Sequence, residues 1–195
     1  MRVLVVINCS KKKVIDLGVV RSRLGTVPSF DLKREYEYRQ VLSDLVKPAI
    51  EMYDGPEFKV LRRFRGCIDV FILSARYGII RDKDLIIPYD AYLNNADYSV
   101  ISTWAMYGNW GLNELTSKTW DLAIIRLSKV YIKFFMKLIK NPCALGNEVH
   151  IIGGRYIDLF NCEGSVRHHI RGPGKAQHVL YELLSRACDD SSTHT

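Results

Sequence analysis

The stretch that decides the fold is R-V-L-V-V-I, Arg2–Ile7, followed at once by N-C-S-K-K-K, Asn8–Lys13. A short, almost continuous run of aliphatic residues is typical of a parallel strand that helices cover on both faces. The polar and basic residues then lie at the carboxyl end of this strand, where open α/β sheets usually bind their ligands. Three adjacent ammonium groups repel one another, which predicts an anion nearby. The alternative is a solvated loop that only keeps the end of the sheet soluble.

Three more apolar runs predict strands, and helical patterns lie between them. The strands are expected at Cys67–Leu73, Trp120–Leu127 and Glu148–Ile152. Helices are expected to begin at Ser29, at Ser128 and near Gly174, whereas residues 9–29 and 74–90 are expected to form loops. Strands that alternate with helices predict an α/β fold with a mainly parallel central sheet and helices on both sides. One domain over residues 1–188 and a polar tail over residues 189–195 account for the chain.

The composition fits one compact domain of 195 residues, 48% hydrophobic and 25% charged. The five cysteines are scattered, with no C-x-x-C pair, and are expected to be reduced and mostly buried thiols with no zinc site. They are Cys9, Cys67, Cys143, Cys162 and Cys188. The first apolar run is too short for a signal peptide core or a membrane span. These observations predict a cytoplasmic protein without a membrane partner.

The net charge of +7, with a pI of about 9.2, favours an anionic partner. The basic residues cluster at Lys11–Lys13, at Lys59–Arg65 and along the expected helix 129–140. Such a pattern fits DNA, RNA or a nucleotide-like small molecule. A basic helix face is more often simply solvated, and the charge does not fix the oligomeric state.

The informative loops all follow predicted strands, so they are expected to converge at one edge of the sheet. In the first, Asn8, Cys9, Ser10 and Lys11 are candidate ligand contacts. Lys13 is a candidate nucleophile or phosphate anchor, because burial and like-charged neighbours lower the pKa of a lysine. Cys9 is a possible nucleophile, with a buried structural thiol as the alternative.

The second and third loops supply the other candidate contacts. The features of these loops are an arginine fork, tyrosines that can stack, and a carboxylate beside an aromatic ring. They suit the binding of a nucleotide or the stabilisation of an oxocarbenium ion, although ordinary turns contain the same residues. The candidates of the second loop are Ser74, Arg76, Tyr77, Gly78 and Tyr89, with Asp90 as the catalytic carboxylate. Those of the third loop are Gly153, Gly154, Arg155 and Tyr156. Glycines there let a ligand approach the backbone closely.

Several sites are excluded by their missing motifs. The chain has neither G-x-G-x-x-G nor G-x-x-x-x-G-K-S/T, which excludes a Rossmann dinucleotide site and a P-loop. His168 and His169 have no partner at metal-ligand spacing, which predicts a surface pair. No metal and no cofactor are expected.

Two of these loops resemble a family of uncharacterised prokaryotic and phage domains. The matching motifs are C-S-K-x-K at Cys9–Lys13 and I-L-S-A-R-Y-G-I-I-x-x-x-x-x-I-x-P-Y-D at Ile72–Asp90. The stretch R-G-P-G-K-A-Q, Arg171–Gln177, is similar to the glycine-rich turn that opens the last helix of that family.

That family in turn resembles the peroxide-stress protein family, which binds DNA, and the core domain of archaeosine synthase. The synthase core carries P-C-x-x-x-K-P-Y, whose lysine is thought to attack a nitrile on a 7-deazaguanine base in tRNA. Cys9 and Lys13 match its C-x-x-x-K, whereas Asn8 replaces the first proline and Val14-Ile15 replaces Pro-Tyr. The resemblance implies a three-layer α/β/α sandwich similar to uracil-DNA glycosylases.

The expected function is therefore an enzyme directed at a nucleic acid or nucleotide, acting on a base or an N-glycosidic bond. Lys13 and Asp90 are its candidate catalytic residues. One alternative is a non-catalytic DNA- or RNA-binding module, and a further one is a hydrolase or transferase of a free nucleotide.

Overall fold

The protein is built around a six-stranded sheet with β1 (Val3–Asn8) near its centre. The structure is a computed structural model, which describes residues 1–172 and 174–189. Pro173, in the expected glycine-rich turn, and residues 190–195 of the expected tail lie outside the described residues. The strand order is β4-β3-β1-β6-β7-β8. The other strands are β3 (Ile68–Ser74), β4 (Gly78–Arg81), β6 (Trp120–Arg126), β7 (Gly146–Gly153) and β8 (Val166–His169). A separate two-stranded sheet pairs β2 (Lys47–Pro48) with β5 (Leu85–Ile86).

The first apolar run forms the buried strand that its composition predicts. Val3 to Ile7 are each at most 3% exposed. β1 pairs in parallel with β3 on one side and with β6 on the other, so that Val5 lies between Val70 and Ile124. The remaining pairs are parallel except for β4, which runs antiparallel to β3 at the edge. The predicted α/β fold with a mainly parallel sheet is confirmed.

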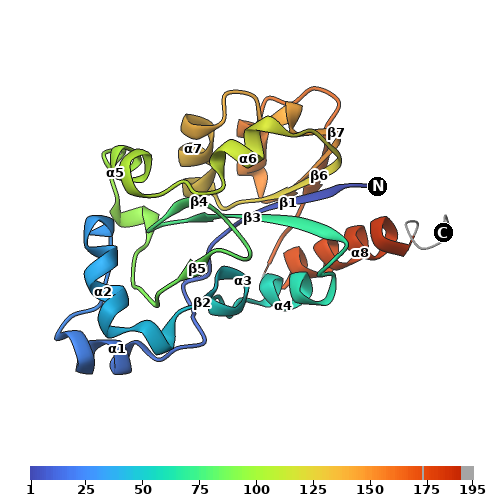
Figure 1. Ribbon diagram of the computed structural model, residues 1–195. Helices are drawn as coiled ribbons and strands as arrows, with labels where there is room; N and C mark the ends of the chain where they lie inside the picture. Colours follow the sequence, from blue (N-terminus) through green and yellow to red (C-terminus); the bar gives the residue numbers. More distant parts are fainter. Residues whose placement is uncertain (173, 190–195) are drawn as a thin grey trace.

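Helices cover both faces of the sheet, as Figure 1 shows. On one face lie α1 (Leu17–Leu24), α2 (Glu35–Val41), α3 (Ala49–Met52), α4 (Pro56–Arg63) and α8 (Lys175–Asp189). On the other face lie α5 (Val100–Tyr107), α6 (Leu112–Ser117) and α7 (Lys129–Leu138). Short 3-10 turns occur at Leu32–Arg34, Ser43–Leu45, Leu93–Asn95, Pro142–Leu145 and Arg155–Leu159. In α7, Ile132 and Phe135 are buried whereas Lys133 is exposed, as its amphipathic pattern predicts.

The strand order creates one switch point. Numbered along the chain, the parallel strands β1, β3, β6, β7 and β8 lie in the order 2-1-3-4-5. The connection after β1 leads to β3 on one side, and the connection after β6 leads to β7 on the other. The carboxyl ends of β1 and β6 therefore border the crevice in which open α/β sheets bind ligands.

Some segments differ from the sequence prediction. Residues 9–29 contain α1, and the expected loop 74–90 contains β4 and β5. β8 was not expected because V-R-H-H is short and polar and pairs only along one edge, with β7. Short or exposed elements such as these depend on tertiary pairing more than on their own pattern.

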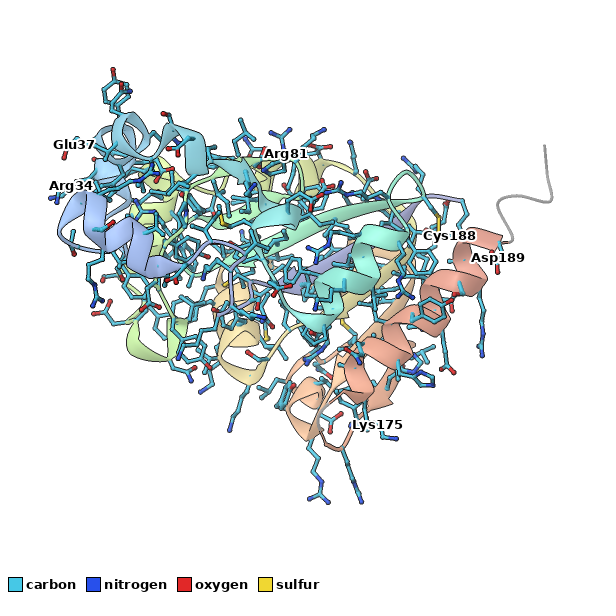
Figure 2. All side chains as sticks on the ribbon, turned by 90° about the horizontal axis from the view of Figure 1, so that it is seen from below. Arg34, Glu37, Arg81, Lys175, Cys188 and Asp189 are labelled. Atoms are coloured by element: carbon cyan, nitrogen blue, oxygen red, sulfur yellow. A yellow bond between two sulfur atoms is a disulfide. The ribbon has the colours of Figure 1, made fainter. Side chains whose placement is uncertain are left out.

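The prediction of reduced thiols is wrong for four of the five cysteines. Disulfides join Cys67 to Cys188 and Cys143 to Cys162, with Cα atoms 6.0 and 5.4 Å apart. Only Cys9 is a free, buried thiol. The sequence separations of 121 and 19 residues give no spacing pattern. The fold brings Cys188 to Cys67, because α8 returns to pack beside α4, which precedes β3 in the chain (Figures 1 and 2).

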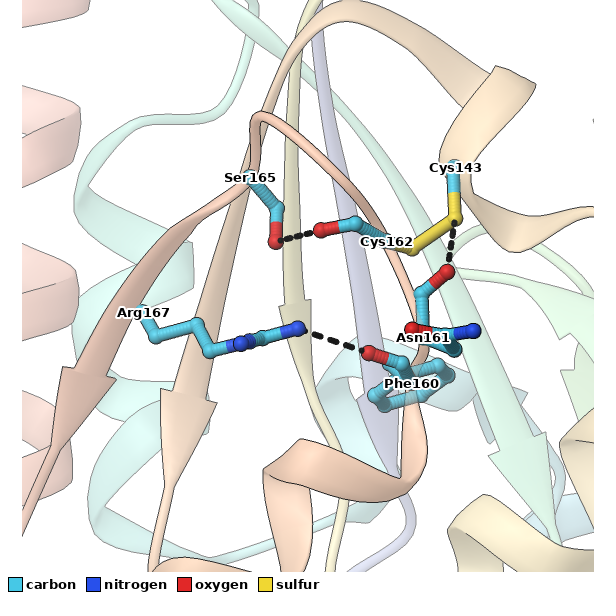
Figure 3. The surroundings of a disulfide bond; sticks show 6 residues. All are labelled: Cys143, Phe160, Asn161, Cys162, Ser165 and Arg167. Atoms are coloured by element: carbon cyan, nitrogen blue, oxygen red, sulfur yellow. Dashed lines mark hydrogen bonds between the residues drawn. A yellow bond between two sulfur atoms is a disulfide. The ribbon is translucent and has the colours of Figure 1, made fainter.

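The Cys143–Cys162 bridge joins the 3-10 turn Pro142–Leu145 to the loop before β8, and further hydrogen bonds hold that loop (Figure 3). Ser165 Oγ donates to the Cys162 carbonyl at 2.9 Å, and Arg167 donates to the Phe160 carbonyl at 3.1 Å. Because four cysteines form disulfides, reduced thiols no longer support a cytoplasmic location. The cytoplasmic location stays a prediction. Among the described residues, no helix is long and apolar enough to span a bilayer.

Candidate functional site

A cavity of about 260 Å³ opens at the switch point of the sheet. Three segments line it, together with Tyr92: the end of β1 at residues 7–11, the start of α4 at residues 55–58, and the β6–α7 junction at Arg126, Ser128 and Tyr131. Asn8, Cys9, Ser10 and Lys11 are thus brought together in one cavity, where the sequence places a ligand site.

Asn8 fixes the two strand ends that border the cavity. Its Oδ1 accepts a hydrogen bond from the backbone N–H of Ser128 at 2.9 Å, and its Nδ2 donates to the carbonyl of Cys9 at 3.0 Å. An amide supplies both an acceptor and donors, so one side chain can join the end of β1 to the start of α7. The side chain of Asn8 therefore positions the cavity walls.

The loop after β1 positions the start of α4. Val14 N–H donates to the carbonyl of Met52 at 2.9 Å, and Asp54 N–H donates to that of Lys12 at 3.0 Å. This pairing places Gly55 against Ser10, where a Cβ on residue 55 would lie 3.1 Å from Ser10 Oγ. Glycine thus permits the close approach of helix and loop.

Two helix N-termini face the cavity. α4 begins after Gly55 and α7 after Ser128, and neither has a side-chain cap for its first backbone N–H groups. Uncapped N–H groups and the positive end of the helix dipole attract anions. Lys11, which is exposed at the cavity, adds positive charge.

Arg126 is a mostly buried charged group in the wall of the cavity. It ends β6, and its side chain is 17% exposed. One nitrogen lies 3.3 Å from Glu57 Oε1 and another lies 3.5 Å from Tyr156 Oη. Its Nε is buried and has no hydrogen-bond partner among the described residues. An unsatisfied buried donor is costly, so Arg126 retains the capacity to bind an acceptor.

Aromatic rings and Cys9 form the apolar part of the cavity. Phe58 and Tyr131 are each 2% exposed, and Tyr92, 40% exposed, also lines the cavity. Cys9 Sγ lies 3.2 Å from Tyr131 Oη and accepts a hydrogen bond from Ala75 N–H at 3.4 Å. The thiol is thus embedded in the wall, as the structural alternative predicts.

Lys13 does not line the cavity but lies beneath the loop. Its side chain is 9% exposed, and Nζ donates to the carbonyls of Ser10 and Lys11 at 3.2 and 3.3 Å. Nζ also lies 4.2 Å from the centre of the Tyr89 ring. Burial lowers the pKa of Lys13, while electrostatic interactions with Cys9 and Asp90 oppose this shift. The lowered pKa agrees with the sequence argument, and the contacts show a side chain that holds the loop.

The rest of the second loop lies mainly inside the protein. Ser74 Oγ and Tyr53 Oη lie 2.8 and 2.7 Å from Tyr89 Oη, in a buried hydroxyl network below Lys13. Asp90 is exposed and interacts electrostatically with Lys13. It does not line the cavity. The structure therefore places the two candidate catalytic residues near each other but outside the cavity.

Arg76 lies in a separate cluster. Its side chain is 0% exposed and pairs with Asp31 at 2.9 Å and Glu35 at 3.0 Å. It also donates to the carbonyl of Ser29. Tyr77 Oη donates to Glu35 at 2.9 Å, so α2 is tied to the turn after β3. Gly78 has a φ of +71°, and a Cβ there would lie 2.1 Å from Asn109 Oδ1. Arg76, Tyr77 and Gly78 are thus not brought to the cavity.

The third loop does not line the cavity and contacts one of its lining residues, Arg126, through Tyr156. Gly153 ends β7, and Gly154 precedes the 3-10 turn that carries Arg155 and Tyr156. Tyr156 Oη lies 3.5 Å from Arg126, whereas exposed Arg155 lines a neighbouring hollow with Lys129 and Asp158. The predicted convergence of three loops is therefore partial.

The structure adds site residues that the sequence argument missed. They are Glu57, Phe58, Tyr92, Arg126 and Tyr131. For Arg126 a signal exists, since it is a charged residue at the carboxyl end of a strongly apolar run. For the others none exists, because tertiary packing alone brings α4 and α7 to the end of β1.

The histidine pair lies on β8, far along the sheet from β1. His168 Nε2 lies 2.9 Å from His150 Nδ1, and His150 Nε2 lies 2.6 Å from Glu148. Within the described residues no group of three or more His, Cys, Asp or Glu side chains is arranged to hold a metal ion.

Comparison with known proteins gives one match. No curated protein and no solved structure matches the chain. The model of a family of unknown function, DUF6884, matches residues 42–146, which is more than half of the chain. The matched segment includes the start of α4, the motif after β3 and Arg126. The chain therefore belongs to the DUF6884 family of unknown function.

Proposed function

We propose that the cavity binds the phosphate and base of a single nucleotide. The observation that carries the proposal is Arg126, whose buried Nε has no partner among the described residues. A guanidinium fork, two uncapped helix N-termini and Lys11 suit a phosphate. Phe58, Tyr92 and Tyr131 suit an aromatic base.

The size of the cavity limits the ligand. Pockets for drug-sized ligands have volumes of about 300–1,000 Å³. The cavity, at about 260 Å³, falls just below this range, which favours one nucleotide over a dinucleotide. The motif resemblance favours the same ligand class, since the families that these motifs resemble act on or bind nucleic acids. On that resemblance we also propose a uracil-DNA-glycosylase-like sandwich as the finer fold class.

The test is calorimetric titration of the protein with 5′-monophosphates, with the corresponding nucleosides and inorganic phosphate as partial ligands. Arg126→Gln removes the charged fork and should weaken nucleotide binding about 10- to 150-fold, the equivalent of about 1.5–3 kcal/mol for charged hydrogen bonds. Arg155→Gln is the matched control, because Arg155 is exposed and does not line the cavity. The proposal fails if no monophosphate binds, or if both variants bind like the wild type.

A catalytic role in base excision or base modification is the second candidate. Glu57 favours it, because this carboxylate lines the cavity 3.3 Å from Arg126. Such a group can position water or steady an oxocarbenium ion. Glu57→Gln should then abolish the release or conversion of the base, which chromatography measures. Nucleotide binding by the variant should persist or strengthen. If Glu57→Gln retains full turnover, Glu57 is not the catalytic carboxylate. If the wild type shows no turnover, the protein is a binding module.

A further inference from the structure

A second hollow adjoins the cavity, between α4 and α8. It has a volume of about 470 Å³ and shares Pro56 with the cavity. Lys59 and Arg63 of α4 line one side, and His178 and Tyr181 of α8 line the other. The two helices lie side by side in both Figures 1 and 2, and we call this hollow the α4–α8 groove.

The α4–α8 groove combines positive charge with an exposed aromatic ring. Lys59 is 64% exposed and lies 3.8 Å from Asp54, whose closer partner is Lys12 at 2.8 Å. Arg63 is exposed as well. Tyr181 is 41% exposed, and its ring centre lies 5.6 Å from that of Phe64, which supports it from below.

We infer that the α4–α8 groove holds the backbone and a neighbouring base of a single-stranded nucleic acid, one nucleotide of which occupies the cavity. This inference rests on the proposed function of the cavity. Lys59 and Arg63 are placed to neutralise phosphates, and Tyr181 offers a stacking surface, the combination found in sequence-tolerant single-strand sites. Since Pro56 borders both hollows, a strand can continue from one into the other.

A single strand fits better than a duplex. A base in a duplex reaches an enclosed cavity only after it is unpaired and turned out of the stack, which costs a few kcal/mol. Tyr181 likewise needs a base with a free face, which a single strand offers along its length and a duplex offers only at its ends. An acidic peptide would match the charges of the groove but has no base for the ring or the cavity, so polyglutamate serves as its test.

The experiment measures fluorescence anisotropy of a labelled single strand of about 12 nucleotides, a length within the usual site size. The double variant Lys59→Gln/Arg63→Gln removes two groove charges. It should lower the slope of log affinity against log salt by about 1.4, since each phosphate contact on a single strand contributes about 0.7. Tyr181→Ala should weaken binding about 5- to 150-fold. Calorimetry with a monophosphate should give unchanged affinity for both variants, because the cavity is intact.

The matched control is Lys133→Gln/Lys137→Gln on α7. It removes the same charge from exposed lysines on the opposite face of the sheet. It should retain most of the affinity and the salt slope of the wild type. Thermal unfolding of each variant checks that the fold is intact.

The outcomes separate the two proposals. If the wild type binds a monophosphate but not the oligonucleotide, the groove inference is overturned and the proposed function stands. If it binds neither, both fail. Three further outcomes would overturn the groove inference alone. The first is an equal loss of affinity in the groove and control variants. The others are displacement of the strand by polyglutamate as readily as by unlabelled strand, and tighter binding of a blunt duplex than of the single strand.

Discussion

Replacing Arg76 tests whether the most recognisable motif of the chain builds the frame or binds the ligand. The guanidinium is 0% exposed and pairs with Asp31 and with Glu35, whose side chain is 14% exposed. Arg76→Met preserves the apolar part of the side chain but removes the cation that joins these two carboxylates. Among the described residues, Glu35 then keeps only Arg39 as an ion-pair partner, at 2.8 Å. Breaking a buried pair from one side costs about 3–5 kcal/mol of the free energy of unfolding. For a chain of this size, about 2–4 °C per kcal/mol gives a fall in Tm of about 6–20 °C.

Circular dichroism during heating and urea unfolding measure this effect in the oxidised protein. Arg23→Met is the control, because the Arg23–Asp44 pair is exposed and should contribute little. Nucleotide binding at a temperature where Arg76→Met is folded should equal that of the wild type. A variant that keeps the Tm of the control and loses the ligand would refute the structural assignment and restore Arg76 as a binding residue.

Two more predictions concern Lys13 and the disulfides. Burial lowers the pKa of Lys13 below its ordinary value of 10.5. Just below that pH the unfolded chain therefore binds more protons at Lys13 than the folded protein does. The contribution of Lys13 to the free energy of unfolding consequently rises with pH in this range. Lys13→Met should therefore reduce the rise in the free energy of unfolding with pH in the range just below pH 10.5, which urea unfolding measures. Identical pH profiles of the variant and the wild type would count against this prediction. Cys188→Ser should destabilise the protein more than Cys162→Ser, by about 4.9 against about 3.3 kcal/mol from loop-closure entropy, because its bridge closes the longer loop. An unchanged Tm for both serine variants under oxidising conditions would mean that the bridges do not form.

The central sheet could be predicted from the sequence because its strands are buried on both faces. Strands of that kind are uninterrupted apolar runs, such as V-L-V-V-I at residues 3–7 and D-L-A-I-I at residues 121–125. Their order in the sheet could not be derived, because pairing is decided by the packing of the whole chain. The position of Asn8–Lys13 at the carboxyl end of a central strand followed from the first run alone.

The three adjacent lysines show where residue patterns fail. Lys11 is exposed at the cavity, Lys12 pairs with Asp54, and Lys13 is buried against Tyr89. Their chemistry is the same, and only contacts with distant segments separate their roles. The prediction of reduced cysteines was wrong for the same reason, since two disulfides join residues that no spacing rule connects.

Arg76 and Arg126 illustrate the same limit from opposite directions. Both are arginines that follow or end a buried strand, and both present a fork that fits a carboxylate or a phosphate. Arg76 meets the chain's own carboxylates from α2, whereas Arg126 meets one carboxylate at 3.3 Å and keeps an unpaired Nε. Because a ligand competes only for donors that the protein leaves unsatisfied, tests of function belong at Arg126 and Glu57. The motif around Arg76 instead ties α2 to the turn after β3, and its replacement should change stability rather than ligand binding.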